Sequence, residues 1–226
     1  INRVGTLGSV TCEDGYAGGI IGYAKDIQLR ESFSSGNVMA VNNTAGGLVG
    51  QCAERNDNDS YDYSAFNYIE NCYSLANVKG TSYAGGLVGD CPVGSIRYSY
   101  ASGEVTASSV GGGIVGRFTG TYSSRIERCF ALNFRIKVGW NKSGYYPNTD
   151  REEDGGAITI ANAMSYDTYH SMSWDFNDYY KIWAIQDGKS FPYLQYFKEY
   201  IPVPTAIKEI ADDEHSGNIK IDIDGQ

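Results

Sequence analysis

The chain has 226 residues, of which 28 are glycine and 19 are tyrosine, and its formal net charge is −9. An acidic chain repels phosphate backbones and anionic membrane surfaces, so we expect no nucleic-acid partner. No apolar stretch reaches the roughly 18 residues that a membrane span needs, so we expect no membrane insertion. Abundant glycine without runs at helical spacing predicts an all-β fold.

A glycine-rich phrase of six residues recurs four times. The copies lie at residues 17–22, 45–50, 84–89 and, as a variant, 111–116, and they start 28, 39 and 27 residues apart. About a dozen extra residues, at 54–66, account for the long interval. Self-similarity at a fixed period is the signature of a solenoid, in which stability comes from stacking one repeat on the next.

A second half-phrase follows each glycine phrase, at residues 29–38, 69–78, 96–105 and, in part, 126–132. The chain start fits the same frame. A period of 27 to 28 residues suits one turn of a parallel β-helix, which we expect to be right-handed and to have about four to five coils. We expect the paired glycines to supply backbone angles closed to other residues and to leave room for tight packing.

Stacking in register would place equivalent residues of successive coils in columns about 4.8 Å apart. One predicted column alternates in charge, as a solvated surface should, because like charges side by side repel. Its members are Arg30, Glu70, Arg97 and Glu127. Two further columns are apolar and predicted to face inward: Leu29, Ile69, Ile96 and Ile126 in one, Val38, Val78 and Val105 in the other.

A fourth column is aromatic and contains Phe33, Tyr73, Tyr100 and Phe130. Two interpretations stay open. The rings could pack as a buried ladder, which stabilises the stack. Alternatively, Tyr73 and Tyr100 could form an exposed platform for a sugar or another chain, because contiguous apolar patches often mark binding sites.

The five cysteines do not resemble the dense, even-numbered framework of small disulfide-rich domains. Cys52 and Cys91 follow the glycine phrase at the same offset, and Cys72 and Cys129 share another offset. Cysteine at repeat-equivalent positions is typical of a small buried apolar residue. A Cys52–Cys91 bridge between neighbouring coils is the alternative.

The insertion at residues 54–66 is the most distinctive local feature, and insertions in solenoids often lie on the binding face. Carboxylates within it are candidate Ca²⁺ ligands, and its aromatic residues are candidate ligand-stacking surfaces; a solvated polar loop is the simpler interpretation. The candidate metal ligands are Asp57, Asp59 and Asp62, and the candidate stacking residues are Tyr61, Tyr63 and Phe66. We expect no other cofactor.

Nothing in the sequence predicts catalysis. The two histidines, His170 and His215, are far apart and lack metal-ligand spacing. The glycine phrase lacks the Lys-Ser/Thr ending of a phosphate-binding loop. With 18 lysines and arginines, the chain has no evident basic groove for acidic polysaccharides. We therefore expect a protein that is not an enzyme.

The phrases Ala-Gly-Gly-Leu-Val-Gly, at residues 84–89, and Ile-Glu-Asn-Cys-Tyr-Ser, at residues 69–74, resemble the repeats of GLUG-motif proteins. The resemblance covers roughly residues 1–135 and continues into a closing segment around residues 174–194. GLUG repeats occur in exported bacterial surface proteins, including those of gut Bacteroidetes and the N-terminal regions of some immunoglobulin-A-cleaving metallopeptidases. The resemblance implies adhesion or display and no active site.

We expect three regions: solenoid repeats at 1–136, a degenerate repeat and C-terminal cap at 137–200, and a linker with the start of a further segment at 201–226. Gly155 and Gly156 are interpreted as a decayed glycine phrase. Terminal units of a solenoid must cover the open end of the stack. The residues expected to plug the last coil are Trp174, Phe176, Trp183 and Phe191.

The resulting hypothesis is a non-catalytic, adhesin-like protein, exported to the cell surface, that binds host or matrix glycans or proteins through its solenoid. The alternative is a spacer or accessory module of a larger secreted protease or polysaccharide-degrading enzyme. The ligand and the oligomeric state stay open.

Overall fold

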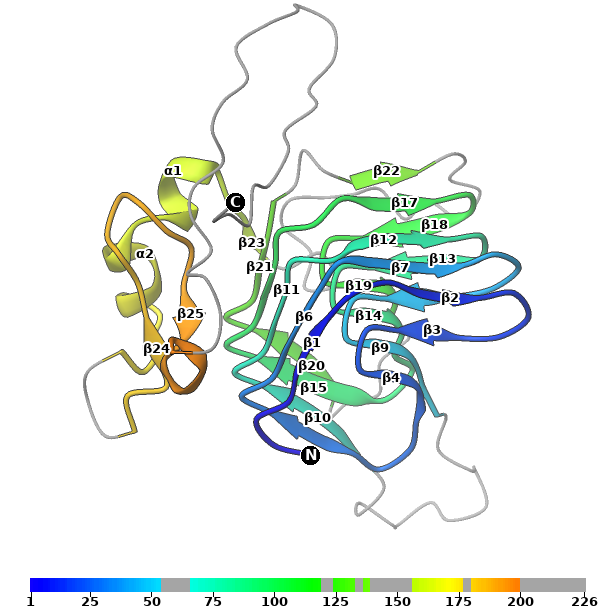
Figure 1. The fold of residues 1–226 in the computed structure, drawn as a ribbon, viewed down its shortest axis with the longest axis horizontal. Coiled ribbons are helices and arrows are strands. Elements are labelled where there is room, and N and C mark those ends of the chain that lie inside the picture. Colours follow the sequence, from blue (N-terminus) through cyan, green and yellow to red (C-terminus); the bar gives the residue numbers. More distant parts are fainter. Residues whose placement is uncertain (54–65, 119–123, 133–135, 139–155, 177–179, 200–226) are drawn as a thin grey trace, which may run out of the picture. The chain divides into compact units, whose positions relative to one another are not determined.

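The structure is a computed structural model that describes residues 1–53, 66–118, 124–132, 136–138, 156–176 and 180–199. The chain divides into two compact units, Ile1–Ile158 and Thr159–Gln226, and each is described by itself. In the first unit, from β1 to β22, every fifth strand joins the same parallel sheet, so the chain winds as a β-helix (Figure 1). The predicted fold class, an all-β parallel solenoid, is confirmed.

Five parallel sheets, which we name A to E, run along the stack. Sheet A contains β5 (Gln28–Arg30), β10 (Asn67–Glu70), β15 (Gly94–Arg97) and β20 (Arg125–Glu127). Sheet B contains β1 (Gly5–Leu7), β6 (Phe33–Ser35), β11 (Tyr73–Ser74), β16 (Tyr100–Ala101), β21 (Phe130–Ala131) and β23 (Gly156–Ala157). Sheet C contains β2 (Val10–Cys12), β7 (Asn37–Ala40), β12 (Asn77–Gly80), β17 (Val105–Ala107) and β22 (Ile136–Val138).

The remaining two sheets meet at the glycine phrase. Sheet D contains β3 (Ala17–Gly18), β8 (Ala45–Gly46), β13 (Tyr83–Gly85) and β18 (Val110–Gly112). Sheet E contains β4 (Ile21–Ala24), β9 (Val49–Cys52), β14 (Val88–Asp90) and β19 (Val115–Arg117). A complete coil runs through sheets B, C, D, E and A in that order.

The register between coils is the one that the repeat predicts. Ile69 pairs with Leu29 on one side and with Ile96 on the other. Val78 is likewise flanked by Val38 and Val105. All members of both predicted apolar columns are buried, with relative exposures of 6% or less. Equivalent residues therefore lie one above another, because each coil pairs residue by residue with the next.

Each coil encloses two separate apolar cores. The larger one lies among sheets A, B and E and is built mainly from long side chains such as Leu29, Leu48 and Ile96. The smaller one lies between sheets C and D, where side chains are short, as at Ala45 and Ala84. Alanine lets these two sheets approach closely, which gives the thin arm formed by the C and D strands in Figure 1.

The phrase glycines are required by space. A Cβ on Gly46 would lie 1.9 Å from the carbonyl oxygen of Val49, and one on Gly85 would lie 1.9 Å from that of Val88. The left-handed glycines of the described residues are Gly8, Gly15, Gly36 and Gly188, none of which belongs to a phrase. Tight packing is thus confirmed, whereas the expectation of backbone angles closed to other residues is wrong. We call this turn between sheets D and E the glycine bend.

The turn between sheets A and B uses the opposite device. Its central residue has a left-handed backbone in every coil, with φ between 45° and 57°, yet it is never glycine. The residues in this column are Arg3, Glu31, Asn71, Tyr98 and Arg128. Left-handed geometry is costly for L-residues other than asparagine and aspartate. We call this turn the left-handed bend.

The stack extends past residue 136. Strand β22 pairs with β17, and β23 pairs with β21, so sheets B and C both gain a further rung. Gly156 stands opposite Phe130 in sheet B. The interpretation of Gly156 as part of a decayed glycine phrase is therefore wrong, because phrase glycines lie at the junction of sheets D and E.

The second unit contains α1 (Ile160–Ala163), α2 (Tyr166–His170), the antiparallel pair β24 (Trp183–Ala184) and β25 (Tyr193–Leu194), and the 3₁₀ helix η3 (Gln195–Phe197). The side chain of Thr159 caps α1 by accepting a hydrogen bond from the Asn162 N–H at 3.2 Å. Aromatic residues form the core of the second unit, where the ring centroids of Trp174 and Trp183 are 4.7 Å apart. The expected plugging of the last coil stays a prediction, and residues 201–226 lie outside the described residues.

Candidate functional site

The alternating charge column lies on the outer face of sheet A, where the sequence predicts it. Arg30 pairs with Glu70 at 3.6 Å, and Arg97 pairs with Glu127 at 3.1 Å. These side chains are between 32% and 50% exposed. Exposed ion pairs of this kind contribute little stability, so the column indicates a solvated face and supports the register.

The aromatic ladder forms as predicted. The ring centroids of Phe33 and Tyr73 are 5.1 Å apart, and those of Tyr73 and Tyr100 are 5.3 Å apart, with planes within 16°. The neighbouring Ser34 points into the coil, because its Oγ donates to the Gly47 carbonyl at 2.6 Å. Since side chains alternate along a strand, the rings lie on the other face of sheet B.

Tyr73 and Tyr100 are nevertheless buried, with relative exposures of 2% and 3%. Burial removes water from the phenol of Tyr73 and raises its pKa above the usual value. Burial of the two rings favours the interpretation as a packed ladder over that of an exposed ligand platform. The rings pack as a ladder, whose stacking stabilises the coils against one another.

Most of the predicted insertion site lies outside the described residues. This applies to the candidate calcium ligands Asp57, Asp59 and Asp62 and to Tyr61 and Tyr63. Phe66 is described, and its ring contacts Tyr68 with centroids 4.8 Å apart. Within the described residues, no three acidic, histidine or cysteine side chains gather as a metal ion requires.

The histidines do not meet either. His170 is exposed in α2, and its ring stacks on Tyr166 with centroids 5.1 Å apart. His215 lies outside the described residues.

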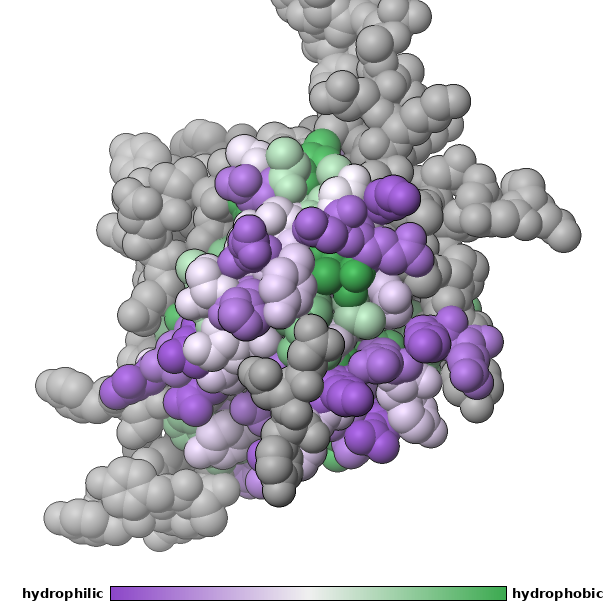
Figure 2. Space-filling view, turned by 90° about the vertical axis from the view of Figure 1, so that its left-hand side faces the viewer, coloured by the Kyte–Doolittle hydropathy of each residue, from purple (hydrophilic) through white to green (hydrophobic). Residues whose placement is uncertain are grey.

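The side of the molecule that is on the left in Figure 1 is largely hydrophilic where it is described, with small apolar areas between polar groups (Figure 2).

Cys72 and Cys129 are structural. Both thiols are buried beside the left-handed bend, where they contact the carbonyl groups of Glu70 and Glu127 at 3.3 Å and 3.4 Å. Ser99 occupies the rung between them, and its hydroxyl contacts the Arg97 carbonyl in the same way. Burial raises the pKa of both thiols to about 12. Neutral, buried thiols are poor nucleophiles, so the prediction of small buried residues is confirmed.

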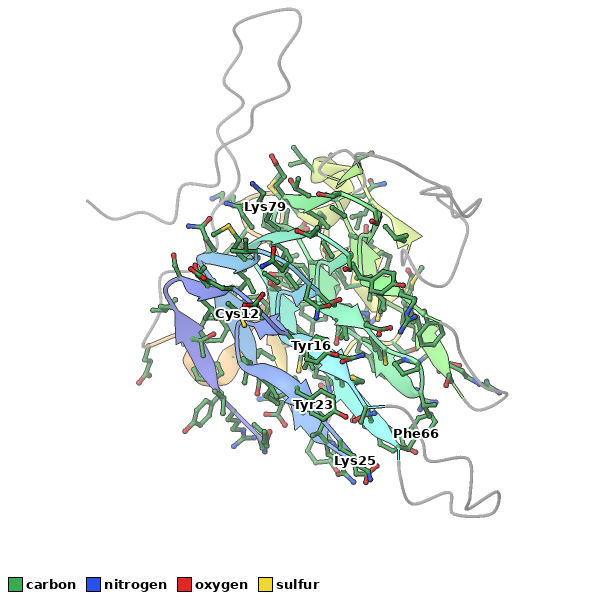
Figure 3. All side chains as sticks on the ribbon, turned by 90° about the vertical axis from the view of Figure 1, so that its right-hand side faces the viewer. Cys12, Tyr16, Tyr23, Lys25, Phe66 and Lys79 are labelled. Carbon is green, nitrogen blue, oxygen red and sulfur yellow. The ribbon has the colours of Figure 1, made fainter. Side chains whose placement is uncertain are left out.

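A different group of side chains gathers on the outside of the glycine bend. Tyr16 precedes β3 and Tyr23 lies in β4, and their rings stack across the bend with centroids 5.8 Å apart (Figure 3). Tyr23 is 57% exposed. The chain turns sharply at this bend as it passes from the smaller core to the larger one. Side chains that point outward on either side of the bend therefore lie close together.

Tyr23 begins a polar column on sheet E. Gln51 pairs with Tyr23 in the register, Asp90 with Gln51, and Arg117 with Asp90. The Arg117 guanidinium donates twice to the Asp90 carboxylate, at 2.8 Å and 2.6 Å, and the Gln51 amide donates to it at 2.9 Å. This bidentate arrangement raises the pKa of Arg117 above its usual value.

Arg117 also lies over the ring of Tyr83 on sheet D, 4.6 Å from its centroid. Tyr83 occupies the rung position on sheet D that Tyr16 occupies two coils earlier, because Ala84 and Ala17 both align with Ala45. We call the six residues on the outside of the glycine bend the corner surface: Tyr16, Tyr23, Gln51, Tyr83, Asp90 and Arg117.

Sequence reasoning missed the corner surface, although a signal was present. Tyr23, Gln51, Asp90 and Arg117 each follow the last glycine of a phrase directly. An outward polar or aromatic residue in that place in every coil indicates a continuous row. Its contacts with the sheet D residues depend on the sharp bend, which the one-dimensional pattern does not reveal.

Comparisons with known proteins bear on the fold. No family model matches the chain, and no curated protein matches it either. Among solved structures, it is similar to a protein from Bacteroides ovatus described as a "putative immunoglobulin A1 protease", with a TM-score of 0.57 and 23% identity. The similarity covers 86% of this chain and 68% of that one. At 23% identity the similarity supports the fold alone.

No helix in the described residues has the length and apolar character of a membrane span.

Proposed function

We propose that this chain is a non-catalytic binding module of an exported, cell-surface protein, and that it holds host or matrix glycans or proteins on the outer face of its solenoid. The observation that carries the proposal is the row from Tyr23 to Arg117 on successive coils. Tyr23 is exposed and Gln51 and Arg117 are half-buried, while the buried Asp90 between them holds both polar side chains in place. Solenoids use such extended surfaces for binding. The resemblance of the glycine phrase to GLUG repeats of bacterial surface proteins adds support.

The test is a binding screen with the folded chain on a glycan array and on an array of mucins, immunoglobulins and matrix proteins. We expect saturable binding to at least one of these classes, lost on thermal unfolding. Absence of binding on both arrays, together with unchanged attachment of cells that lack the protein, would contradict the proposal.

A second candidate function is an accessory module of a larger secreted protease. The name of the Bacteroides ovatus protein supports it. In this case the region would hold substrate while another domain cleaves it. We expect the isolated chain to bind immunoglobulin A1 without cleaving it, as followed by surface plasmon resonance and by gel electrophoresis. Cleavage by the isolated chain would contradict the non-catalytic assignment.

A further inference from the structure

We propose that the corner surface is a binding site for a short, neutral oligosaccharide. This inference rests on the proposed function and names its site and ligand class. Tyr16 and Tyr23 would hold one sugar ring, and the polar column would hold its neighbours. Three features of the surface support this ligand class: an aromatic face, hydrogen-bonding groups that remain available, and balanced charge.

The aromatic face comes from the stacked pair Tyr16–Tyr23. Tyr23 is 57% exposed, although its ring is supported from behind by Tyr16. A supported ring loses little conformational freedom when a ligand binds, which favours affinity. The flat apolar face of a tyrosine suits the C–H face of a pyranose, and its hydroxyl suits the polar edge.

The polar side chains of Gln51 and Arg117 are held in place by Asp90, and Gln51 keeps hydrogen-bonding groups available for a ligand. Gln51 uses its amide N–H toward Asp90, which leaves its Oε1 as an acceptor and a second N–H as a donor. Arg117 uses Nε and one terminal nitrogen toward Asp90, and its guanidinium also interacts with Tyr83, which fixes its orientation. Planar groups with fixed donors and acceptors match the adjacent hydroxyls of a sugar.

The charge of the surface argues for a neutral ligand. The guanidinium of Arg117 is already neutralised by Asp90, whose side chain is 2% exposed. Lys25 and Asp26, two and three residues beyond Tyr23, are both exposed. The net charge of −9 would repel a carboxylated sugar.

The length of the row argues for several sugar units. Tyr23 and Arg117 are separated by three inter-coil steps, or about 14 Å at the usual strand spacing. A single sugar would reach one end of this row. A ligand of three or four units would contact both Tyr23 and Gln51 and approach Arg117.

The experiment is calorimetric titration of the folded chain with mannotriose, maltotriose, tri-N-acetylchitotriose and, as an acidic probe, sialyllactose. We expect one or more neutral sugars to bind. Tyr23→Ala should weaken that binding about tenfold through lost stacking, Gln51→Ala should weaken it less, and Tyr23→Phe should largely preserve it. The matched control is Tyr68→Ala, since Tyr68 is 40% exposed on sheet A, away from the corner surface.

The outcomes separate this proposal from the general one. If the arrays show binding but Tyr23→Ala and Gln51→Ala leave it unchanged, the corner surface is not the site and the binding function stands. Preference for sialyllactose would contradict the neutral ligand class. Binding to neither array would remove the function itself.

A second inference rests on a different observation, the two cysteine columns. Gln51 and Asp90 pair in the register, which places the residues that follow them, Cys52 and Cys91, on adjacent rungs. Strands in a sheet lie about 4.8 Å apart, within the Cα separation of about 4.4–6.8 Å that a disulfide allows. Both side chains are fully buried, and the Cys52 thiol contacts that of Cys91 and contributes most to raising its pKa.

We infer that Cys52 and Cys91 join the second and third coils by a disulfide when the protein folds with a small disulfide such as oxidised glutathione. One thiolate attacks the glutathione disulfide and releases one reduced glutathione. The other thiolate then displaces the second, so the protein loses two protons and two electrons. Because both sulfurs are buried, the exchange takes place before the coils close.

The chain contains its own control. Cys72 and Cys129 are two rungs apart with Ser99 between them, since Glu70, Arg97 and Glu127 align in register. That separation, about 9.6 Å, is too long for a disulfide. Refolding in glutathione redox buffer should therefore link Cys52 to Cys91 and leave Cys72 and Cys129 reduced.

Peptide mapping by mass spectrometry measures the linkage, and urea unfolding measures its effect. The oxidised protein should unfold at higher urea concentration than the reduced one, because the bridge closes a long loop. Cys52→Ala should remove this difference and still fold, since Ala24 occupies the same column one coil earlier. Reduced Cys52 and Cys91 after oxidative refolding, or a Cys72–Cys129 link, would overturn the inference.

Discussion

The two sharp turns of each coil solve the same geometric problem by different means. At the glycine bend, ordinary backbone angles bring strands so close that no Cβ fits, as at Gly46. At the left-handed bend there is room for large side chains, such as Tyr98 and Arg128, but the backbone is strained. One turn therefore selects a residue for its size, and the other tolerates many residues at an energetic cost. The phrase is visible in the sequence because the first requirement is strict.

The largest effect that tests this difference is Gly46→Ala. The added methyl would lie 1.9 Å from the Val49 carbonyl oxygen and 2.5 Å from the Gly89 nitrogen, both in the backbone. We expect a loss of at least about 3 kcal/mol in the free energy of unfolding, or failure to fold. Urea denaturation followed by circular dichroism measures it. Near-native stability would mean that the strands can separate at this bend.

High pH tests the buried thiols beside the left-handed bend. The folded pKa of Cys72 and Cys129 is about 12, above the ordinary 9.0. Between these values the folded state binds more protons than the unfolded state, so stability falls as the pH rises from about 9 to about 12. The double variant Cys72→Ser/Cys129→Ser should show a shallower fall in melting temperature. An identical slope would contradict burial of the thiols.

Asn71→Val tests strain at the left-handed bend. Asn71 has a φ of 54°, which a β-branched residue adopts poorly. We expect a loss of about 1–2 kcal/mol, measured by urea unfolding. Asn71→Gly is the matched control, because glycine accepts the same conformation without a side chain. Equal losses in both variants would assign the effect to contacts of the asparagine side chain instead.

Glu70→Gln should have the smallest effect. Glu70 ends β10 next to the left-handed bend, and its ion pair with Arg30 spans 3.6 Å with both side chains partly exposed. We expect a change below about 0.5 kcal/mol, which vanishes at high salt. A larger effect would mean that charge, as well as strain and thiol burial, controls this bend.

The site was less predictable than the fold. Columns such as Leu29 with Ile69 follow from the period alone, since each coil pairs with an equivalent copy of itself. The burial of Tyr73 and Tyr100 did not follow, because both faces of sheet B can carry aromatic residues in a row. The Tyr16–Tyr23 contact was missed because Tyr16 precedes β3 and Tyr23 lies in β4, so the two rings meet only across the glycine bend.

The sequence by itself determined the period, the parallel stacking and the register, because hydrogen bonds between coils repeat whatever spacing the chain repeats. Only the tertiary structure decided why the glycines are needed, where Gly156 belongs and which side chains meet at the corner surface. Those answers depend on which atoms lie across a bend or opposite a strand. Packing sets the distances between such atoms, and the spacing of residues along the chain does not encode them.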